Sequence, residues 1–291
     1  MNKSGFIYSS LRSVYRFFRQ DIIFGLILLP YGRKKHRELL RTSDRKNDHT
    51  YTSFYRSPVQ LNVLTGTALK YINKAPNERL SINVFASSNG AEAYTIASTL
   101  LAAHPGLDFH IFASDLHQSM VDKANSATYT LQEITQGLEV DEKFMTQTFD
   151  KIGDELFKVK ESIQKHITFE QADLLSDSLS QQFAKSDIVF AQNVLFHMPP
   201  EMARKAFHSI VTFLKPHSVL FLEGMEIEMR VELVKKEKLT PLTENIKKIY
   251  EYSRKHISDD WWNHYWGNEP WFGLTKDKEF RYGTVFLKSE D

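Results

Sequence analysis

The sequence predicts an α/β fold, and two observations carry that prediction. From Leu80 onward, short apolar strand patterns alternate with helical patterns, which is typical of a parallel sheet with helices on its faces. Within this region, Val84–Asp115 runs from an apolar strand through a turn of small residues into a helix, and then into a second strand that ends in a carboxylate. Open α/β sheets hold adenosine-containing cofactors in this way. We therefore expect a Rossmann-like sheet with a nucleoside site at its edge.

The N-terminal part of the chain is predicted to be a helical domain. Residues 5–29 combine aromatic and aliphatic residues with arginines, a pattern that suits either a helix packed on a domain or an interfacial membrane helix. Polar residues 41–50 are typical of a linker, and residues 51–73 form a second helical stretch. These features divide the chain into an N-terminal helical region, residues 1–78, and a sheet domain, residues 79–291.

The sheet domain is predicted to contain strands at 81–86, 108–113, 166–169, 187–191, 218–222 and 281–287. One stretch breaks the alternation of strands and helices, because Glu155–Lys160 has a period-2 strand pattern. We interpret residues 138–170 as a small β-subdomain inserted beside the sheet. A second insertion, residues 228–280, contains all four Trp residues. It is either a satellite core over the sheet edge or a lid that forms an apolar acceptor pocket.

Composition limits the class of protein. The chain has 291 residues, 42% of them hydrophobic, which suits one globular core with an accessory domain. It has no cysteine, which excludes disulfides and Cys nucleophiles and fits a reducing cytoplasm. The eleven His residues show no metal-ligand spacing, so we expect no metal. The apolar run Ile22–Leu29 is far shorter than the ~20 residues needed to span a bilayer.

Charge is unevenly distributed along the chain. Residues 1–50 hold eleven Lys and Arg against four Asp and Glu, so the rest of the chain is mildly acidic. An acidic sheet domain without a basic stripe argues against nucleic-acid binding. We expect a cytoplasmic protein, and the basic N-terminal helix leaves peripheral membrane contact open.

The turn after the first strand favours a cofactor without a pyrophosphate. A dinucleotide site would normally carry three glycines, but this turn has Ser88 and a single glycine, Gly90. Asp115 follows Gly90 by 25 residues, near the spacing of a ribose-binding acid. Taken singly, Asp115 could equally cap a helix or face solvent.

These motifs together resemble a known family. Ser88–Ala97 resembles the Ser-Thr-Gly-Glu-Glu-Pro-Tyr-Ser-Ile-Ala signature of the chemotaxis receptor methyltransferases, the CheR family, and Thr50–Arg56 resembles that family's Thr-x-Thr-x-Phe-Phe-Arg segment. Further segments are similar in the same order: Ala124–Tyr129, Asp173–Leu175, Gln192–Val194 and Arg281–Leu287. Phe144–Leu175 resembles the family's small antiparallel β-subdomain, which in some members docks a receptor peptide.

The resemblance implies a class I methyltransferase sheet that binds S-adenosylmethionine and releases S-adenosylhomocysteine. It implies an enzyme that methylates a carboxylate, with a receptor-like protein glutamate as the acceptor. Seven positions match residues of the cofactor site: Ser88, Gly90, Glu92, Asp115, Asp173, Leu174 and Asn193. Glu92 would receive the cofactor's ammonium group, although an ordinary acidic residue at a helix N-terminus satisfies the same pattern. Asn193 could equally be a turn-forming residue.

Two positions are candidate catalytic residues. Arg56 could orient the acceptor, because its planar guanidinium binds a carboxylate through two parallel hydrogen bonds, or it could be a surface residue of a helical hinge. The family's active-site Tyr corresponds to His197, and the preceding Arg of that segment to Gln192. His197 could be a general base for a hydroxyl or amine acceptor, or it could cap the next helix.

These departures from the family pattern leave two alternatives open. One is a biosynthetic methyltransferase that acts on a small-molecule or lipid-like acid or hydroxyl acceptor, which includes a small carboxylic acid. The other is a cofactor-binding module without catalytic activity.

Overall fold

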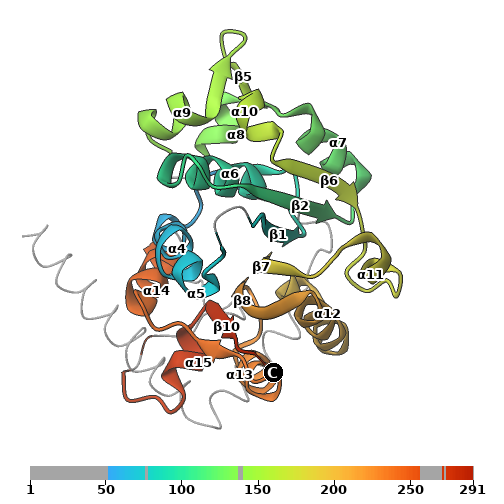
Figure 1. Ribbon diagram of the computed structural model, residues 1–291, viewed down its shortest axis with the longest axis vertical. Helices are drawn as coiled ribbons and strands as arrows, with labels where there is room; N and C mark the ends of the chain where they lie inside the picture. The colour runs from blue at the N-terminus through green and yellow to red at the C-terminus, as the bar shows by residue number, and fades with distance from the viewer. Residues whose placement is uncertain (1–51, 76–77, 137–139, 256–270, 272, 291) are drawn as a thin grey trace, which may run out of the picture.

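The computed structural model describes residues 52–75, 78–136, 140–255, 271 and 273–290. Its centre is a seven-stranded sheet with the strand order β6-β2-β1-β7-β8-β10-β9 (Figure 1). The strands are β1 (Leu80–Phe85), β2 (Phe109–Asp115), β6 (Ile167–Gln171), β7 (Ser186–Gln192), β8 (Leu214–Glu223), β9 (Thr240–Pro241) and β10 (Val285–Lys288). The first five in spatial order are parallel, whereas β10 is antiparallel to both its neighbours. The Rossmann-like α/β fold expected from the sequence is confirmed.

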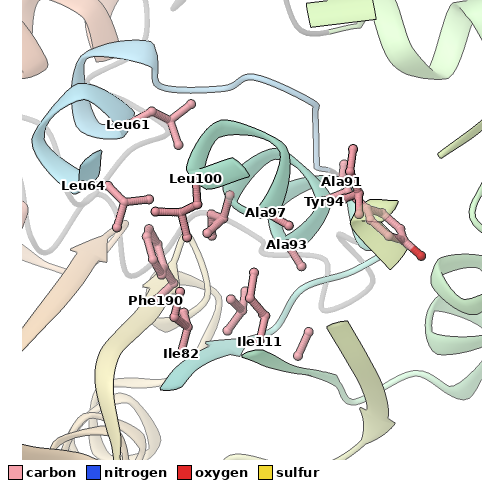
Figure 2. Packing of buried hydrophobic residues seen from close by; sticks show 14 of the residues in the cluster. Leu61, Leu64, Ile82, Ala91, Ala93, Tyr94, Ala97, Leu100, Ile111 and Phe190 are labelled. Atoms are coloured by element: carbon pink, nitrogen blue, oxygen red, sulfur yellow. The ribbon is translucent and has the colours of Figure 1, made fainter. Parts of the chain in front are cut away.

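The central strands are apolar because both of their faces are covered. Every residue of β7 is buried, and its side chains alternate between two cores. Phe190 belongs to the core under α6 (Ala91–Ala103), whereas Val189 and Ala191 belong to the core under α12 (Pro200–Thr212). Figure 2 shows the first core, in which Ile82, Ile111 and Phe190 lie under α6.

Helices cover both faces and connect the strands (Figure 1). Among the described residues before β1, the chain forms one helical stretch, divided into α4 (Pro58–Val63), the π-helical turn Leu64–Ala68 and α5 (Leu69–Ile72). Pro58 begins α4, where its fixed φ suits the first turn and its missing N–H costs nothing. The remaining helices are α7 (Gln118–Ser126), α8 (Leu131–Thr135), α9 (Glu142–Thr148), α10 (Glu161–Gln164), α11 (Leu179–Gln182), α13 (Ile227–Lys236), α14 (Ile246–Lys255) and α15 (Lys278–Tyr282).

A second, antiparallel sheet of three strands confirms the small β-subdomain. Its order is β3 (Thr128–Thr130), β5 (Leu156–Val159) and β4 (Phe149–Lys151). The small sheet takes its first strand from before residue 138, whereas β6 lies in the main sheet. The division of the chain into domains remains a prediction.

Three sequence expectations about elements need correction. Residues 52–57 are not helical, because Ser57 precedes a proline, which disfavours helical backbone, and Tyr55 has a φ of 52°. The last strand begins at Val285 rather than at 281, since Lys278–Tyr282 forms α15. Strand β9 was not expected, because two residues give no periodic signal.

Several expectations fall outside the described residues. They are the helix at 5–29 with its proposed membrane contact, the linker 41–50, and Trp261, Trp262 and Trp266. Trp271 is described and stacks on Tyr282 with ring centroids 4.5 Å apart. Among the described helices, none combines the length and the apolar character needed to cross a bilayer. Within the same residues, no group of three or more His, Asp or Glu side chains could hold a metal ion.

Candidate active site

The turn between β1 and α6 is tied to the end of β2 by Asp115. The backbone N–H of Ser88 donates to Oδ2 of Asp115 at 2.8 Å, and the N–H of His117 donates to Oδ1 at 3.0 Å. Ser88 has a positive φ of 50°, a conformation that persists only where surrounding contacts hold it. Asp115 therefore fixes the shape of the turn, and its contact with a ribose remains a prediction.

Gly90 lets the turn lie close to neighbouring elements. It is the N-cap of α6 and has a φ of 86°, which favours glycine. A Cβ at this position would lie 2.9 Å from the Cβ of Ala124 and 2.9 Å from Cζ of Phe169. The single glycine of the motif is thus required by packing as well as by backbone conformation.

A narrow pocket, with a cavity volume of about 20 Å³, opens beside this turn. Its walls come from the segment before α4, from α4 itself, from the first turns of α6 and from the end of β7. Apolar walls are supplied by Leu61, Ile96 and Phe190. The polar groups of the lining are Ser53, Arg56, Ser57, Gln60, Glu92, Thr95 and Gln192.

Arg56 and Glu92 share this pocket without pairing. Within the described part of the chain, neither side chain makes a hydrogen bond or an ion pair. Burial raises the pKa of Glu92 from its usual 4.5 to about 7; the positive charge of Arg56 opposes this rise, and the negative charge of Glu223 adds to it. A cation and a carboxyl group that have no partner among the described residues therefore face the same space, which suits bound groups of opposite charge.

The backbone around Arg56 is anchored to two other elements. Phe54 is fully buried, and the N–H of Tyr55 donates to Oγ1 of Thr95 on α6 at 3.1 Å. On the other side, Gln60 of α4 is 2% exposed and bonds to Gln192 of β7. The backbone on both sides of Arg56 is thus held at the pocket by contacts that are distant in the sequence, and the role of Arg56 remains a prediction.

Seven of the nine predicted site residues do not line this pocket: Ser88, Gly90 and Asp115 of the turn region, and Asp173, Leu174, Asn193 and His197. Asp173 is exposed, and its Oδ1 accepts the N–H of Leu175 at 2.8 Å. Leu174 is buried in the second core. His197 ends a 3₁₀ turn, Leu195–His197, with its ring 3.9 Å from that of Phe196.

Asn193 directly follows β7 and has features of both roles considered for it. Its φ of 54° and its close approach to Gly224, where a Cβ would lie 2.6 Å from Cα of Asn193, are those of a turn residue. Its Nδ2 is buried and has no hydrogen-bond partner among the described residues. Such an orphaned donor is the kind of group that a bound ligand satisfies.

The sequence did not single out three pocket residues as functional. Gln60 gave no signal, and Ser53 lies in the matched segment Thr50–Arg56 at a position where the family pattern specifies no residue. Gln192 appeared only as a departure from the family pattern. Glu223 also influences the site, because its negative charge raises the pKa of Glu92. It lies beside Gln192 in the register of β7 and β8, and its position at the end of an apolar strand was the signal that could have indicated a role in the site.

The residues present fit S-adenosylmethionine. Glu92 is a carboxyl group in position for an ammonium, and Asp115 ends the strand next to the turn, where the fold places a ribose. Asn193 supplies the buried donor without a partner. A single glycine is sufficient because this cofactor has no pyrophosphate.

The sheet order, the clamped turn and the charged pocket define a Rossmann-like nucleoside-binding domain of the methyltransferase type. The chain belongs to the CheR methyltransferase family: the family profile described as "CheR methyltransferase, SAM binding domain" matches residues 50–246. The expectation of S-adenosylmethionine as the cofactor is thereby confirmed.

Curated relatives agree with the family. A chemotaxis protein methyltransferase of Vibrio parahaemolyticus is 31% identical over 182 residues, which are 60% of this chain and 64% of the relative. Chemotaxis protein methyltransferase 1 of Vibrio cholerae is 31% identical over 183 residues, with the same two shares. The matched region thus spans less than two-thirds of each of these relatives, 64% of its length. A solved O-methyltransferase family protein from Burkholderia thailandensis is 14% identical, with a TM-score of 0.39 over 80% of this chain and 57% of that chain.

Proposed function

We propose that this protein transfers a methyl group from S-adenosylmethionine to the side-chain carboxylate of a protein glutamate. The observation that carries this proposal is the unpaired guanidinium of Arg56 in the same pocket as Glu92. A guanidinium without a partner in a partly apolar pocket is costly unless it serves a negatively charged ligand.

The reaction needs little covalent assistance from the protein. When bound, S-adenosylmethionine supplies an electrophilic methyl group. The acceptor carboxylate is already ionised at pH 7, so no general base is required. Arg56 holds this carboxylate through its fork of N–H donors, Glu92 receives the cofactor's ammonium, and the apolar walls at Ile96 and Phe190 exclude water.

The acceptor we propose belongs to a receptor-like protein. The relatives named above are chemotaxis protein methyltransferases, which supports a protein glutamate over a free acid. A small carboxylic acid could meet the same guanidinium, so the experiment has to separate the two acceptors. His197 does not line the pocket and gives no support to a general-base mechanism.

The test is to incubate the protein and methyl-labelled cofactor with the membrane fraction of the cells in one reaction and with their small-molecule fraction in another. We expect label on membrane protein that is released as methanol by mild alkali. Arg56→Gln should lower this rate by about 100-fold, because it removes a charged donor from the reacting group. Arg79→Gln is the matched control, since Arg79 pairs with Asp108 on the surface.

Three results would contradict the proposal. Alkali-labile label confined to the small-molecule fraction would identify a biosynthetic enzyme. Cofactor binding without any transfer would identify a binding module. An unchanged rate in Arg56→Gln would remove Arg56 from the acceptor site.

A further inference from the structure

Two linked hydrogen bonds, one buried and one partly buried, connect the end of β7 and α4 beside the pocket to the residue that precedes β10. Nε2 of Gln192, at the end of β7, donates to Oε1 of Gln60 at 2.7 Å. Nε2 of Gln60, on α4, donates to Oγ1 of Thr284 at 2.7 Å, and Thr284 directly precedes β10. Gln60 and Gln192 are 2% and 8% exposed. We call these two linked hydrogen bonds, Gln192–Gln60–Thr284, the amide relay.

The amide relay holds Gln60 in one orientation. A buried amide group that loses its hydrogen-bond partner is destabilising, so the side chain keeps both bonds. Its oxygen is used by Gln192 and its nitrogen by Thr284. The two partners lie 132 and 224 residues away in sequence, so no local structure could substitute for them.

Gln60 lies in the first turn of α4, four residues after Arg56 in the sequence. The N–H of Leu61 donates to the carbonyl of Ser57 at 3.0 Å, which starts the helix directly after Arg56. Fixing Gln60 therefore fixes the first turn of α4 relative to β7. On the other side of Arg56, the N–H of Tyr55 is bonded to Thr95. Arg56 is the residue between these two attachments, and it reaches the pocket from a backbone held at both ends.

We propose that Gln60 is a positioning residue that, through the amide relay, holds Arg56 over the pocket where the acceptor carboxylate is bound. This inference rests on the proposed function of Arg56. It assigns no contact between Gln60 and either substrate. The reason for such a device is that misplacing an orienting group by about 1 Å can cost on the order of 100-fold in rate.

The main test variant is Gln60→Met, which keeps the length of the side chain and removes both bonds of the relay. We expect kcat/KM for the acceptor to fall by at least about 10-fold, while the Kd for S-adenosylhomocysteine stays within about 2-fold. Gln60→Glu still accepts from Gln192 and from the hydroxyl of Thr284, so it should recover most of the activity. Thr284→Val removes the outer bond alone and should show a smaller loss in the same direction.

The control is Ser98→Ala. Ser98 on α6 is fully buried and bonds to Thr148 at 2.7 Å, and neither residue lines the pocket. This variant also loses two side-chain hydrogen bonds of one residue, those of the Ser98 hydroxyl with Thr148 and with Gln147, so it should lower Tm without changing kcat/KM. An equal loss of kcat/KM in Ser98→Ala, or an unchanged value in folded Gln60→Met, would overturn the proposal.

A second readout does not depend on catalysis. The Nε–H signal of Arg56 in the NMR spectrum can be assigned by its disappearance in Arg56→Lys. In Gln60→Met we expect this signal to shift and its order parameter to fall, with no change in Ser98→Ala. If the wild-type protein methylates no acceptor, the proposed function fails. The comparison of the Arg56 Nε–H signal in wild type and in Gln60→Met still decides whether Gln60 positions Arg56. An unchanged Arg56 signal in Gln60→Met would refute the positioning role in either case.

Discussion

The ring of Phe54 meets the ring of Tyr129 edge-on, with centroids 4.9 Å apart. Phe149 approaches Phe54 to 5.1 Å from the opposite strand of the small sheet. Phe54 lies two residues before Arg56, so this contact attaches the segment that carries Arg56 to the β-subdomain. The small sheet is therefore part of what holds the pocket together.

Phe54→Ala should lower the free energy of unfolding by about 3–5 kcal/mol, because it leaves a cavity between the segment and the small sheet. Urea denaturation at pH 7 measures this. Phe112→Ala is the matched control, because Phe112 is 37% exposed on β2 and should cost far less. Equal losses in the two variants would show that the aromatic cluster is not a major support.

Asp115→Asn should destabilise the turn that carries the cofactor motif. The amide keeps one acceptor oxygen and replaces the other with a donor, so either Ser88 or His117 loses its partner. We expect a loss of about 1–3 kcal/mol in stability and at least a 10-fold weaker Kd for S-adenosylhomocysteine by calorimetry. Asp122→Asn, which changes an exposed carboxylate of α7, should leave both values nearly unchanged.

Gly90→Ala should destabilise the protein by about 1–3 kcal/mol, since it adds both a left-handed backbone penalty and contacts at 2.9 Å with Ala124 and Phe169. Gly66→Ala offers a matched control, because no atom lies within 4 Å of its added Cβ and Gly66 lies in a helical turn. That variant should be neutral or slightly more stable. Thermal and urea denaturation would measure the change in stability of each variant relative to wild type. Equal losses in Gly90→Ala and Gly66→Ala would contradict the prediction.

The stability contributed by Glu92 should fall as the pH rises. Its pKa is raised in the folded protein to about 7, so the folded state keeps a proton that the unfolded chain releases above pH 4.5. The contribution is complete below pH 4.5 and is lost as the pH passes through 7. Glu92→Gln cannot ionise, so we expect it to be about 1–3 kcal/mol more stable than wild type at pH 8 and equal to it at pH 4.5.

Cofactor binding should have the opposite dependence on pH. Only the ionised form of Glu92 attracts an ammonium, so the affinity for S-adenosylhomocysteine should increase from pH 6 to pH 7.5. Glu92→Gln should bind more weakly and without this dependence. Glu142→Gln, which changes an exposed residue in the first turn of α9, should behave like wild type. A wild-type affinity that is flat over this range would exclude Glu92 as the ammonium site.

The sequence by itself determined the unit from β1 to β2. Its strand and helix patterns, the small-residue turn and the terminal Asp115 are local features, so periodicity and spacing were enough to predict an α/β fold with a nucleoside site. The same local patterns misplaced the start of β10. The residues Lys278–Tyr282, which precede it, form the short helix α15, in which Arg281 and Tyr282 are buried. They missed β9 because two residues are too few to show a period.

Only the tertiary structure brought Arg56 and Glu92 into one pocket and joined Gln60 to Gln192. Arg56 reaches the sheet because Phe54 packs on the small β-subdomain and Gln60 bonds to β7, contacts between segments that the sequence separates widely. No pattern within a short window encodes such contacts. The local sequence set the elements and the turn after β1, whereas burial and long-range hydrogen bonds decided which side chains face the pocket.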